Sequence, residues 1–311
     1  MADPSTAARY PIPTTLNLVI IGTQLVCVAG VFYGASIATT WQELVLLAVV
    51  FGVVGNSIYS IIHEAEHRIL HPVRKVNDVL GTAMALLFPA PFHLIRQGHI
   101  GHHLRNRSDD EAFDFYFIGE RPLLKWLQLY GTLTGLFWIT VVLSNIIVLV
   151  CPYVLQRRYF AFDRPSAALM ESLNPAYWRL IKLEAVLVIT QHTLIVWGMG
   201  IPFLNYVAVY FGFGFTWSAM QYVHHFGTER HVLRGTRNLW ICAPIDWIWL
   251  HHNWHLSHHR HPTLPWIYLP QVAREENPGR EFLLWHYLQM WRGPRYTDER
   301  VENRYAGRII N

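Results

Sequence analysis

Histidines occur in this chain at spacings that bring their rings together. Three clusters are His63 with His67, then His99 with His102 and His103, then His255 with His258 and His259. Residues three or four apart lie on one face of a helix, so each cluster can direct two or three imidazoles at one point. Pairs of imidazoles at this spacing are a common arrangement of metal ligands. The clusters therefore predict metal binding.

A ninth ligand is expected in the segment Gln221-Tyr-Val-His-His225-Phe-Gly. Gln221 and His225 are four residues apart, whereas His224 points about 100° away from His225 along a helix. We therefore expect His225 to be the ligand, with His231 as a secondary candidate. Nine imidazoles exceed the positions around one transition metal, which saturates at about four to six. Two ions are expected, and nitrogen ligands suit iron, zinc or copper.

Acidic and amide side chains beside the clusters are candidates for orienting metal-bound rings. A carboxylate commonly accepts the second ring N–H of a ligating histidine and so fixes its tautomer. From the acidic run Asp109, Asp110, Glu111 and Asp114 we expect Asp114 to have this role, together with Glu64. Gln221 and Asn253 are also expected to contact and orient metal-bound rings. The other histidines are interpreted as surface or structural residues, namely His251, His252, His261, His71, His93, His192 and His286.

The first cluster also matches the zinc protease pattern His-Glu-x-x-His, in which two histidines hold zinc and the glutamate activates water. A catalytic zinc site needs three protein ligands and an open position. That ligand count would leave five clustered histidines without a role. An intramembrane zinc protease therefore remains an alternative to a two-metal site, and a metal transporter is disfavoured because the clusters lie at span ends.

The composition indicates a protein embedded in lipid. Hydrophobic residues make up 52% of the chain and charged residues 15%, against about 45–50% and about 25% in average soluble domains. The net charge of +4 comes from basic residues gathered in particular loops, which does not favour nucleic-acid binding. The cysteines Cys27, Cys151 and Cys242 are far apart and predict no disulfide framework.

Four apolar stretches have about the 20-residue length that a membrane-spanning helix needs. They are residues 15–37, 44–62, 182–197 and 202–222, and they pair as two hairpins without basic residues in their connections. The positive-inside rule then assigns every histidine cluster to the cytoplasmic face. We expect one membrane-embedded domain over 1–311, an all-α fold with a cytoplasmic helical cap, and a cytoplasmic tail over about 262–311.

Two further apolar runs do not fit a four-span count. Residues 79–95 are broken by Pro89 and Pro91, and they are expected to be re-entrant or interfacial. Residues 126–155 are long enough to cross once, but one extra crossing would separate the second cluster from His225. An interfacial helix or a short in-and-back hairpin is therefore favoured, with six crossings as the competing count.

The three clusters together resemble the histidine boxes of the membrane fatty acid desaturase and hydroxylase superfamily. The resemblance covers His63 to about Pro270, and the segment around His225 is similar to a further motif of membrane alkane hydroxylases. In that motif Asn and Glu stand where this chain has Gln221 and His224. The short second cluster is typical of desaturases, whereas the third, followed by Pro262 and Thr263, also fits alkane hydroxylases.

The resemblance implies a non-haem di-iron centre, O₂ as the oxidant and two external electrons per turnover. It implies a fatty acid or fatty-acyl substrate and a desaturase-like oxidation of an unactivated C–H bond. Alkane or fatty acid hydroxylation, or oxidative decarboxylation to a terminal alkene, is the runner-up. No haem-binding motif or iron–sulfur cysteine set is present in the sequence, so a separate ferredoxin, rubredoxin or cytochrome b5-type carrier with its reductase is expected.

Overall fold

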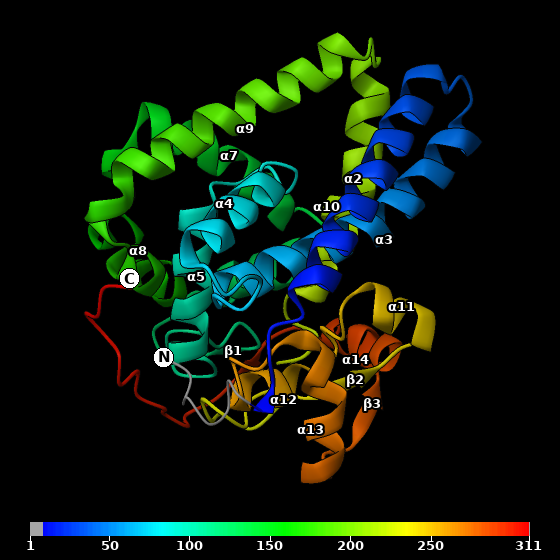
Figure 1. The fold of residues 1–311 in the computed structure, drawn as a ribbon. Helices are drawn as coiled ribbons and strands as arrows, with labels where there is room; N and C mark the ends of the chain where they lie inside the picture. Colours follow the sequence, from blue (N-terminus) through cyan, green and yellow to red (C-terminus); the bar gives the residue numbers. More distant parts are fainter. Residues whose placement is uncertain (1–8, 311) are drawn as a thin grey trace.

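The computed structural model describes residues 9–310 and is almost entirely helical (Figure 1). The ends of the expected domain, residues 1–8 and Asn311, lie outside this range. The described α-helices are α2 (Thr14–Ile37), α3 (Trp41–Glu66), α4 (Arg74–Ala85), α5 (Phe92–Arg105), α6 (Pro122–Leu133), α7 (Phe137–Val150), α8 (Arg164–Ser172), α9 (Trp178–Gly198), α10 (Phe203–Met220), α11 (Ala243–Ile248), α12 (His255–Arg260), α13 (Leu269–Glu276) and α14 (Leu283–Met290).

Short 3₁₀ turns and strands connect these helices. The 3₁₀ turns are η1 (Pro152–Val154), η2 (Arg157–Phe160), η3 (Pro175–Tyr177) and η4 (Trp266–Tyr268). The strands form two parallel pairs, β1 (Phe115–Tyr116) with β4 (Arg295–Tyr296) and β2 (Asn238–Trp240) with β3 (Arg280–Phe282). The segment expected to be a tail, residues 262–310, thus folds back as α13, α14, β3 and β4 onto the rest of the cap.

Three helical segments of the described chain are long and apolar enough to cross a membrane: α2, α3 and the segment Pro175–Gly198 that contains α9. The turn between α2 and α3 ends in a capping box, in which Thr40 Oγ1 accepts the Glu43 N–H and Glu43 Oε2 accepts the Thr40 N–H. This cap starts α3 at the turn, and α3 then packs against α2. The predominantly helical membrane fold that was expected is therefore present.

The helix α10, expected to be a fourth span, packs lengthwise against α3 (Figure 1). Glycines make the approach close: a Cβ on Gly212 would lie 2.2 Å from the Ala48 carbonyl oxygen, and one on Gly55 would lie 2.3 Å from the Phe213 ring. Small residues at such positions let two helices touch along their backbones. The ends of α3 and α10 are thereby held beside one another.

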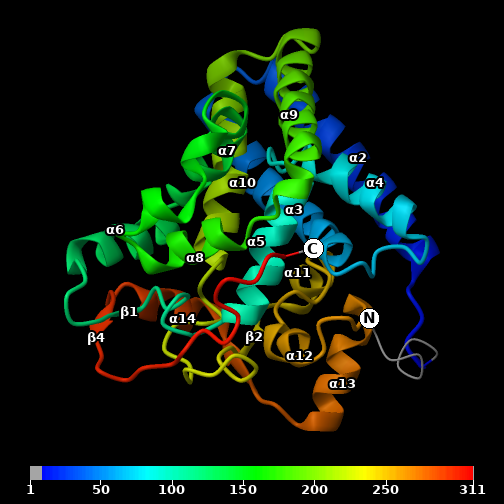
Figure 2. The ribbon, with the colours of Figure 1, turned by 90° about the vertical axis from the view of Figure 1, so that its left-hand side faces the viewer.

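The two irregular apolar runs are both broken in the structure. The helices α6 and α7 meet at an angle of 96°, with Gly135 between them at a φ of +85°. A non-glycine residue would be strained at that φ. The prolines Pro89 and Pro91 separate α4 from α5. Neither run is one straight crossing, as expected. Below the spans the C-terminal helices α11, α12, α13 and α14 form a cap (Figure 2).

Candidate metal centre

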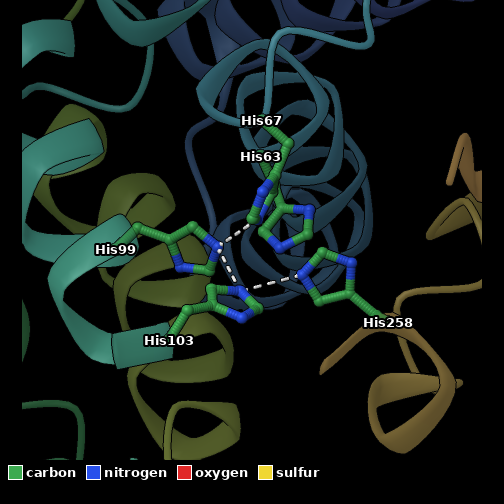
Figure 3. Close-up of side chains that lie close together, drawn as sticks. All are labelled: His63, His67, His99, His103 and His258. Atoms are coloured by element: carbon green, nitrogen blue, oxygen red, sulfur yellow. Dashed lines mark hydrogen bonds between the residues drawn. The ribbon is translucent and has the colours of Figure 1, made fainter. Parts of the chain in front are cut away.

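Five histidines form one compact group at the cap end of α3. His63 and His67 lie in the last turn and at the C-cap of α3, His99 and His103 lie on α5, and His258 comes from α12 (Figure 3). One ring nitrogen from each lies within 4.8 Å of those of all the others. The Nε2 atoms of His67 and His99 are 2.8 Å apart, and those of His103 and His258 are 3.0 Å apart. Ring nitrogens directed at one point are the ligand arrangement of a bound cation.

Four histidines form a second group beside the first. They are His102 on α5, His225 in the turn after α10, and His255 and His259 on α12, and their nearest ring nitrogens also lie within 4.8 Å of one another. The two groups touch, because the rings of His103 and His259 stack with centroids 4.2 Å apart. The nine histidines expected as ligands are thus the members of two adjoining groups, each of which could hold one metal ion.

The adjacent histidine pairs on α5 and α12 explain why there are two groups. Neighbouring residues on a helix point about 100° apart, so one pair of adjacent histidines cannot face a single centre. His102 and His103 accordingly enter different groups, and so do His258 and His259. A helix carrying His-x-x-His-His therefore supplies both groups at once.

Burial, together with the neighbouring imidazoles, makes these rings poor bases. Both effects hold the pKa of seven rings well below the usual range of histidine, namely His67, His99, His103, His225, His255, His258 and His259. A neutral imidazole keeps a lone pair on one nitrogen, and only that form can bind a metal. These seven rings are therefore neutral, and able to bind a metal, at neutral pH.

These pKa shifts predict how acid affects the metal-free protein. An unfolded histidine takes up a proton near its ordinary pKa of about 6.5, whereas the buried rings stay neutral to lower pH. Above about pH 6.5 the rings are neutral in both the folded and the unfolded chain and do not lower the free energy of unfolding. Below that pH the free energy of unfolding falls, by up to about 1.4 kcal/mol per ring for each unit by which the folded pKa lies below the unfolded one.

We expect the melting temperature of chelator-treated protein in detergent to fall steeply between about pH 7.5 and 5.5. His259→Ala should make this dependence shallower, because it removes one buried ring. His261→Ala is the matched control, since His261 is a half-exposed ring paired with Glu276. A melting temperature that stays constant or rises on acidification would contradict the predicted direction.

Two rings of the four-histidine group are oriented through their second nitrogen. His102 Nδ1 lies 3.2 Å from Glu111 Oε1, and His225 Nδ1 lies 3.0 Å from the Gly235 carbonyl oxygen, so each ring donates from Nδ1 and offers Nε2 to the group. Although burial raises the pKa of Glu111, Arg105 and His102 hold that pKa below its usual value. The carboxylate beside His102 is therefore ionised.

The Glu111 contact gives a testable result. Substitutions of such a ring partner weaken metal binding by about 10–100-fold. We expect Glu111→Ala to lower affinity for the second metal equivalent by this factor in a chelator-competition titration. The matched control is Asp110→Ala, which removes the neighbouring carboxylate, a partner of Asn303. An equal loss in both variants would show that the loop as a whole, rather than the Glu111 carboxylate, supports the site.

Two of the four residues expected to orient rings instead hold structural segments together. Asp114 accepts the Tyr222 O–H at 2.7 Å and the Gly227 N–H at 2.8 Å, so it anchors both ends of the turn that carries His225. Glu64 accepts the Trp266 N–H at 3.1 Å, which ties α3 to η4. Asp114 thus supports a ligand through the backbone, whereas Glu111, from the same acidic run, is the residue at a ring.

The two amides also lie near the groups. Gln221 Nε2 donates to the Trp217 carbonyl at 3.2 Å, and the buried Asn253 accepts the Leu239 N–H through its main-chain oxygen at 2.8 Å. In the described part of the chain, no hydrogen bond joins Glu64, Asp114, Gln221 or Asn253 to one of the nine rings. Their role at a metal stays a prediction.

His252 lies at the site and not on the surface, which corrects the sequence interpretation. Its ring centroid lies 4.9 Å from that of His63 and 5.3 Å from that of His255, so it touches both groups. Burial lowers the pKa of His252 to about 4. His224 is also buried, with its ring 4.5 Å from that of His255. The signal that was missed is that His251 and His252 form a doublet one helical turn before the third cluster.

The remaining histidines have other partners. His231 Nδ1 accepts main-chain N–H groups of its own turn, His93 pairs with Glu184, and His286 pairs with Glu281. His93 and His286 match the structural role expected for isolated histidines. His231, the secondary ligand candidate, is not a member of either group.

Fold and site together define a membrane protein in which helix ends and a cap present nine buried or half-buried imidazoles as two adjoining groups. Comparison with known families agrees with that class: the family model described as fatty acid desaturase matches residues 39–294. The chain belongs to the fatty acid desaturase family. Among curated proteins it is similar to the sphingolipid delta(4)-desaturase DES1 of Drosophila melanogaster, with 27% identity over 241 residues, covering 76% of this chain and 67% of that protein.

The family and the geometry together disfavour the zinc protease alternative. In a protease of that kind the glutamate of His-Glu-x-x-His would face a metal-bound water. Here Glu64 accepts the Trp266 N–H, and His63 and His67 share their group with three further imidazoles. The desaturase family makes the protein a lipid oxidoreductase of the membrane.

Proposed function

We propose that the protein is an O₂-dependent di-iron oxidoreductase that acts on an unactivated C–H bond of a fatty acid or fatty-acyl chain, in the manner of a desaturase. The observation that carries the proposal is the division of nine buried or half-buried imidazoles into adjoining groups of five and four. Membership of the desaturase family supports the lipid substrate and the oxidative chemistry.

The donor set fits a pair of iron ions. All nine donors are imidazole nitrogens, which suit iron. His63 Nε2 and both ring nitrogens of His259 are buried without a hydrogen-bond partner, a costly state that a bound cation would relieve. His63, His67, His99, His103 and His258 would hold one ion, and His102, His225, His255 and His259 the other. When bound, the irons supply O₂ activation and accept the external electrons.

Aromatic side chains separate the site from the centre of the membrane domain. The ring of Tyr59 lies 6.0 Å from that of His252 and 5.5 Å from that of Trp217, and Phe88 packs on Trp217 at 4.8 Å. These residues keep water from the side of the metals that faces the spans, and they offer an apolar surface to a hydrocarbon chain. Positioning of the chain against that surface would select the carbon that reacts.

The overall desaturation balances with one O₂, two electrons and two protons: two hydrogens leave adjacent carbons, a double bond forms and two waters are released. We propose that a separate ferredoxin, rubredoxin or cytochrome b5-type carrier delivers the electrons, and that the site faces the cytoplasm. Exposed basic residues at Arg74 and Lys75 support docking of an acidic carrier at that face.

The test is incubation of the purified, iron-loaded protein with a reductase, a carrier and a mixture of fatty acids, acyl thioesters and alkanes, followed by mass spectrometry. We expect new double bonds that require both O₂ and reductant and that are lost in His225→Ala. New alcohols or terminal alkenes would instead identify the hydroxylase or decarboxylase outcome. Full activity without O₂ in a protein that holds only zinc would refute the proposal.

A further inference from the structure

The helices α6 and α14 expose large apolar side chains outside the expected spans. Leu127 of α6 is 63% exposed, and Trp285 and Leu288 of α14 are 54% and 53% exposed. We call the outer face formed by these two helices the α6–α14 surface, and its residues are Leu123, Leu127, Leu284, Trp285, Leu288 and Trp291. A contiguous apolar patch of this kind usually marks an interaction site.

Specific contacts join the two helices into one surface. The Trp126 ring covers Gly293, just after α14, so closely that a Cβ there would lie 2.5 Å from it. The ring of Tyr130 stacks near that of Trp291 at 5.5 Å, and Tyr287 donates its O–H to the Leu133 carbonyl. The exposed faces of α6 and α14 therefore belong to a single rigid unit.

The surface is continuous with the apolar side chains that α7 exposes. Because α6 meets α7 at 96°, α6 runs across the base of the helical bundle while α7 rises along it, and α14 lies beneath α6 (Figure 2). The outer side of α7 carries exposed aliphatic residues, namely Ile139, Val142, Leu143, Ile146 and Val150. Exposed arginines flank the α6–α14 surface, Arg121 before α6 and Arg292 after α14.

We propose that the α6–α14 surface is embedded in the interfacial layer of the bilayer that the spans cross. Tryptophan and leucine beside arginine are the composition that binds the boundary between lipid head groups and acyl chains. Glu281, which directly precedes α14 in β3, is paired with His286 at 2.7 Å. By contrast, the exposed residues of α13 are polar or charged, namely Gln271, Arg274, Glu275 and Glu276.

The contact would fix the height of the third histidine cluster relative to the lipid. The strand β3 leads directly into α14 and pairs with β2. In β2, Asn238 Oδ1 accepts the N–H groups of Leu256 and Ser257 in the first turn of α12. The helix that carries His255, His258 and His259 is thus connected through two short strands to the embedded face.

Spin-label accessibility tests the proposal in the full chain reconstituted into nanodiscs of phosphatidylcholine and phosphatidylglycerol. Cys27, Cys151 and Cys242 are replaced by alanine, and single cysteines are introduced by Leu288→Cys, by Leu127→Cys or, as the matched control, by Gln271→Cys. We expect labels at 288 and 127 to collide at least severalfold more often with O₂, relative to a water-soluble nickel chelate, than the label at 271.

Two outcomes would overturn the proposal. Access of the nickel chelate to 288 and 127 equal to that at 271 would place the surface in water. Protection from both reagents would mean that protein, such as a second copy of the chain, covers it. Two label positions on different helices keep the test decisive if one variant fails to fold. No result depends on the metals or on activity.

Discussion

His259→Ala is expected to remove the metal of the four-histidine group and to abolish lipid oxidation. Loss of a residue that only hydrogen-bonds to a ligating histidine already weakens metal binding by about 10–100-fold. Loss of the ligating histidine itself should therefore reduce activity by at least about 100-fold. The iron content should fall by about half, because the five-histidine group keeps all its members.

The measurement is iron per chain by elemental analysis, alongside product formation. His261→Ala is the matched control, because His261 is two residues away and pairs with the Glu276 carboxylate at the surface. We expect that variant to keep both iron and activity. A normal iron content in His259→Ala would show that the four-histidine group does not bind a metal.

Asp114→Ala is expected to give a large loss of stability. Arg107 is completely buried, and it pairs with Asp114 and with the Tyr222 hydroxyl. Removing the carboxylate leaves the guanidinium charge buried without its counterion, which typically costs about 3–5 kcal/mol. The turn that carries His225 would lose its anchor as well. The variant should therefore melt well below the parent protein and bind less metal.

Thermal unfolding in detergent, followed by intrinsic fluorescence, measures this effect. Glu229→Ala is the control, since it breaks the ion pair with Arg234, which is exposed. That variant should melt with the parent protein. The double variant Arg107→Met with Asp114→Leu should recover much of the loss, because apolar replacement of both partners leaves no buried charge. An equal loss in the double and single variants would refute the explanation.

The clustering of these histidines could be predicted because their spacing is a local property. Offsets of three and four place His99 and His103 on one face whatever the tertiary fold, so the clusters are visible in the sequence. Which cluster members share a group depends on how α3, α5 and α12 meet, and the spacing does not contain that information. His252 was missed although it stands in a doublet just before the third cluster, because the doublet does not show that the tertiary fold brings the His252 ring beside those of His63 and His255.

Apolar run length predicted the positions of four helices, since α2, α3, α9 and α10 begin and end within about four residues of the apolar runs. The contact of Glu111 with a ring was not expected, because four acidic residues in one loop differ only in their tertiary contacts. An interfacial helix was among the expectations for residues 126–155, which include most of α6, but an apolar outer face on α14 was not expected, because residues 262–311 were expected to be a cytoplasmic tail. The exposed leucines and tryptophans of α14 form a surface only together with α6.

The glycine contact between α3 and α10 sets the separation of the two halves of the site from a distance. His63 lies in the last turn of α3, and His225 follows α10. The spacing of these two helices at Gly212 and Gly55 therefore affects the distance between the two imidazoles. A side chain at Gly212 or Gly55 would push α3 and α10 apart. The geometry of the two histidine groups therefore depends on helix packing that lies within the expected membrane spans.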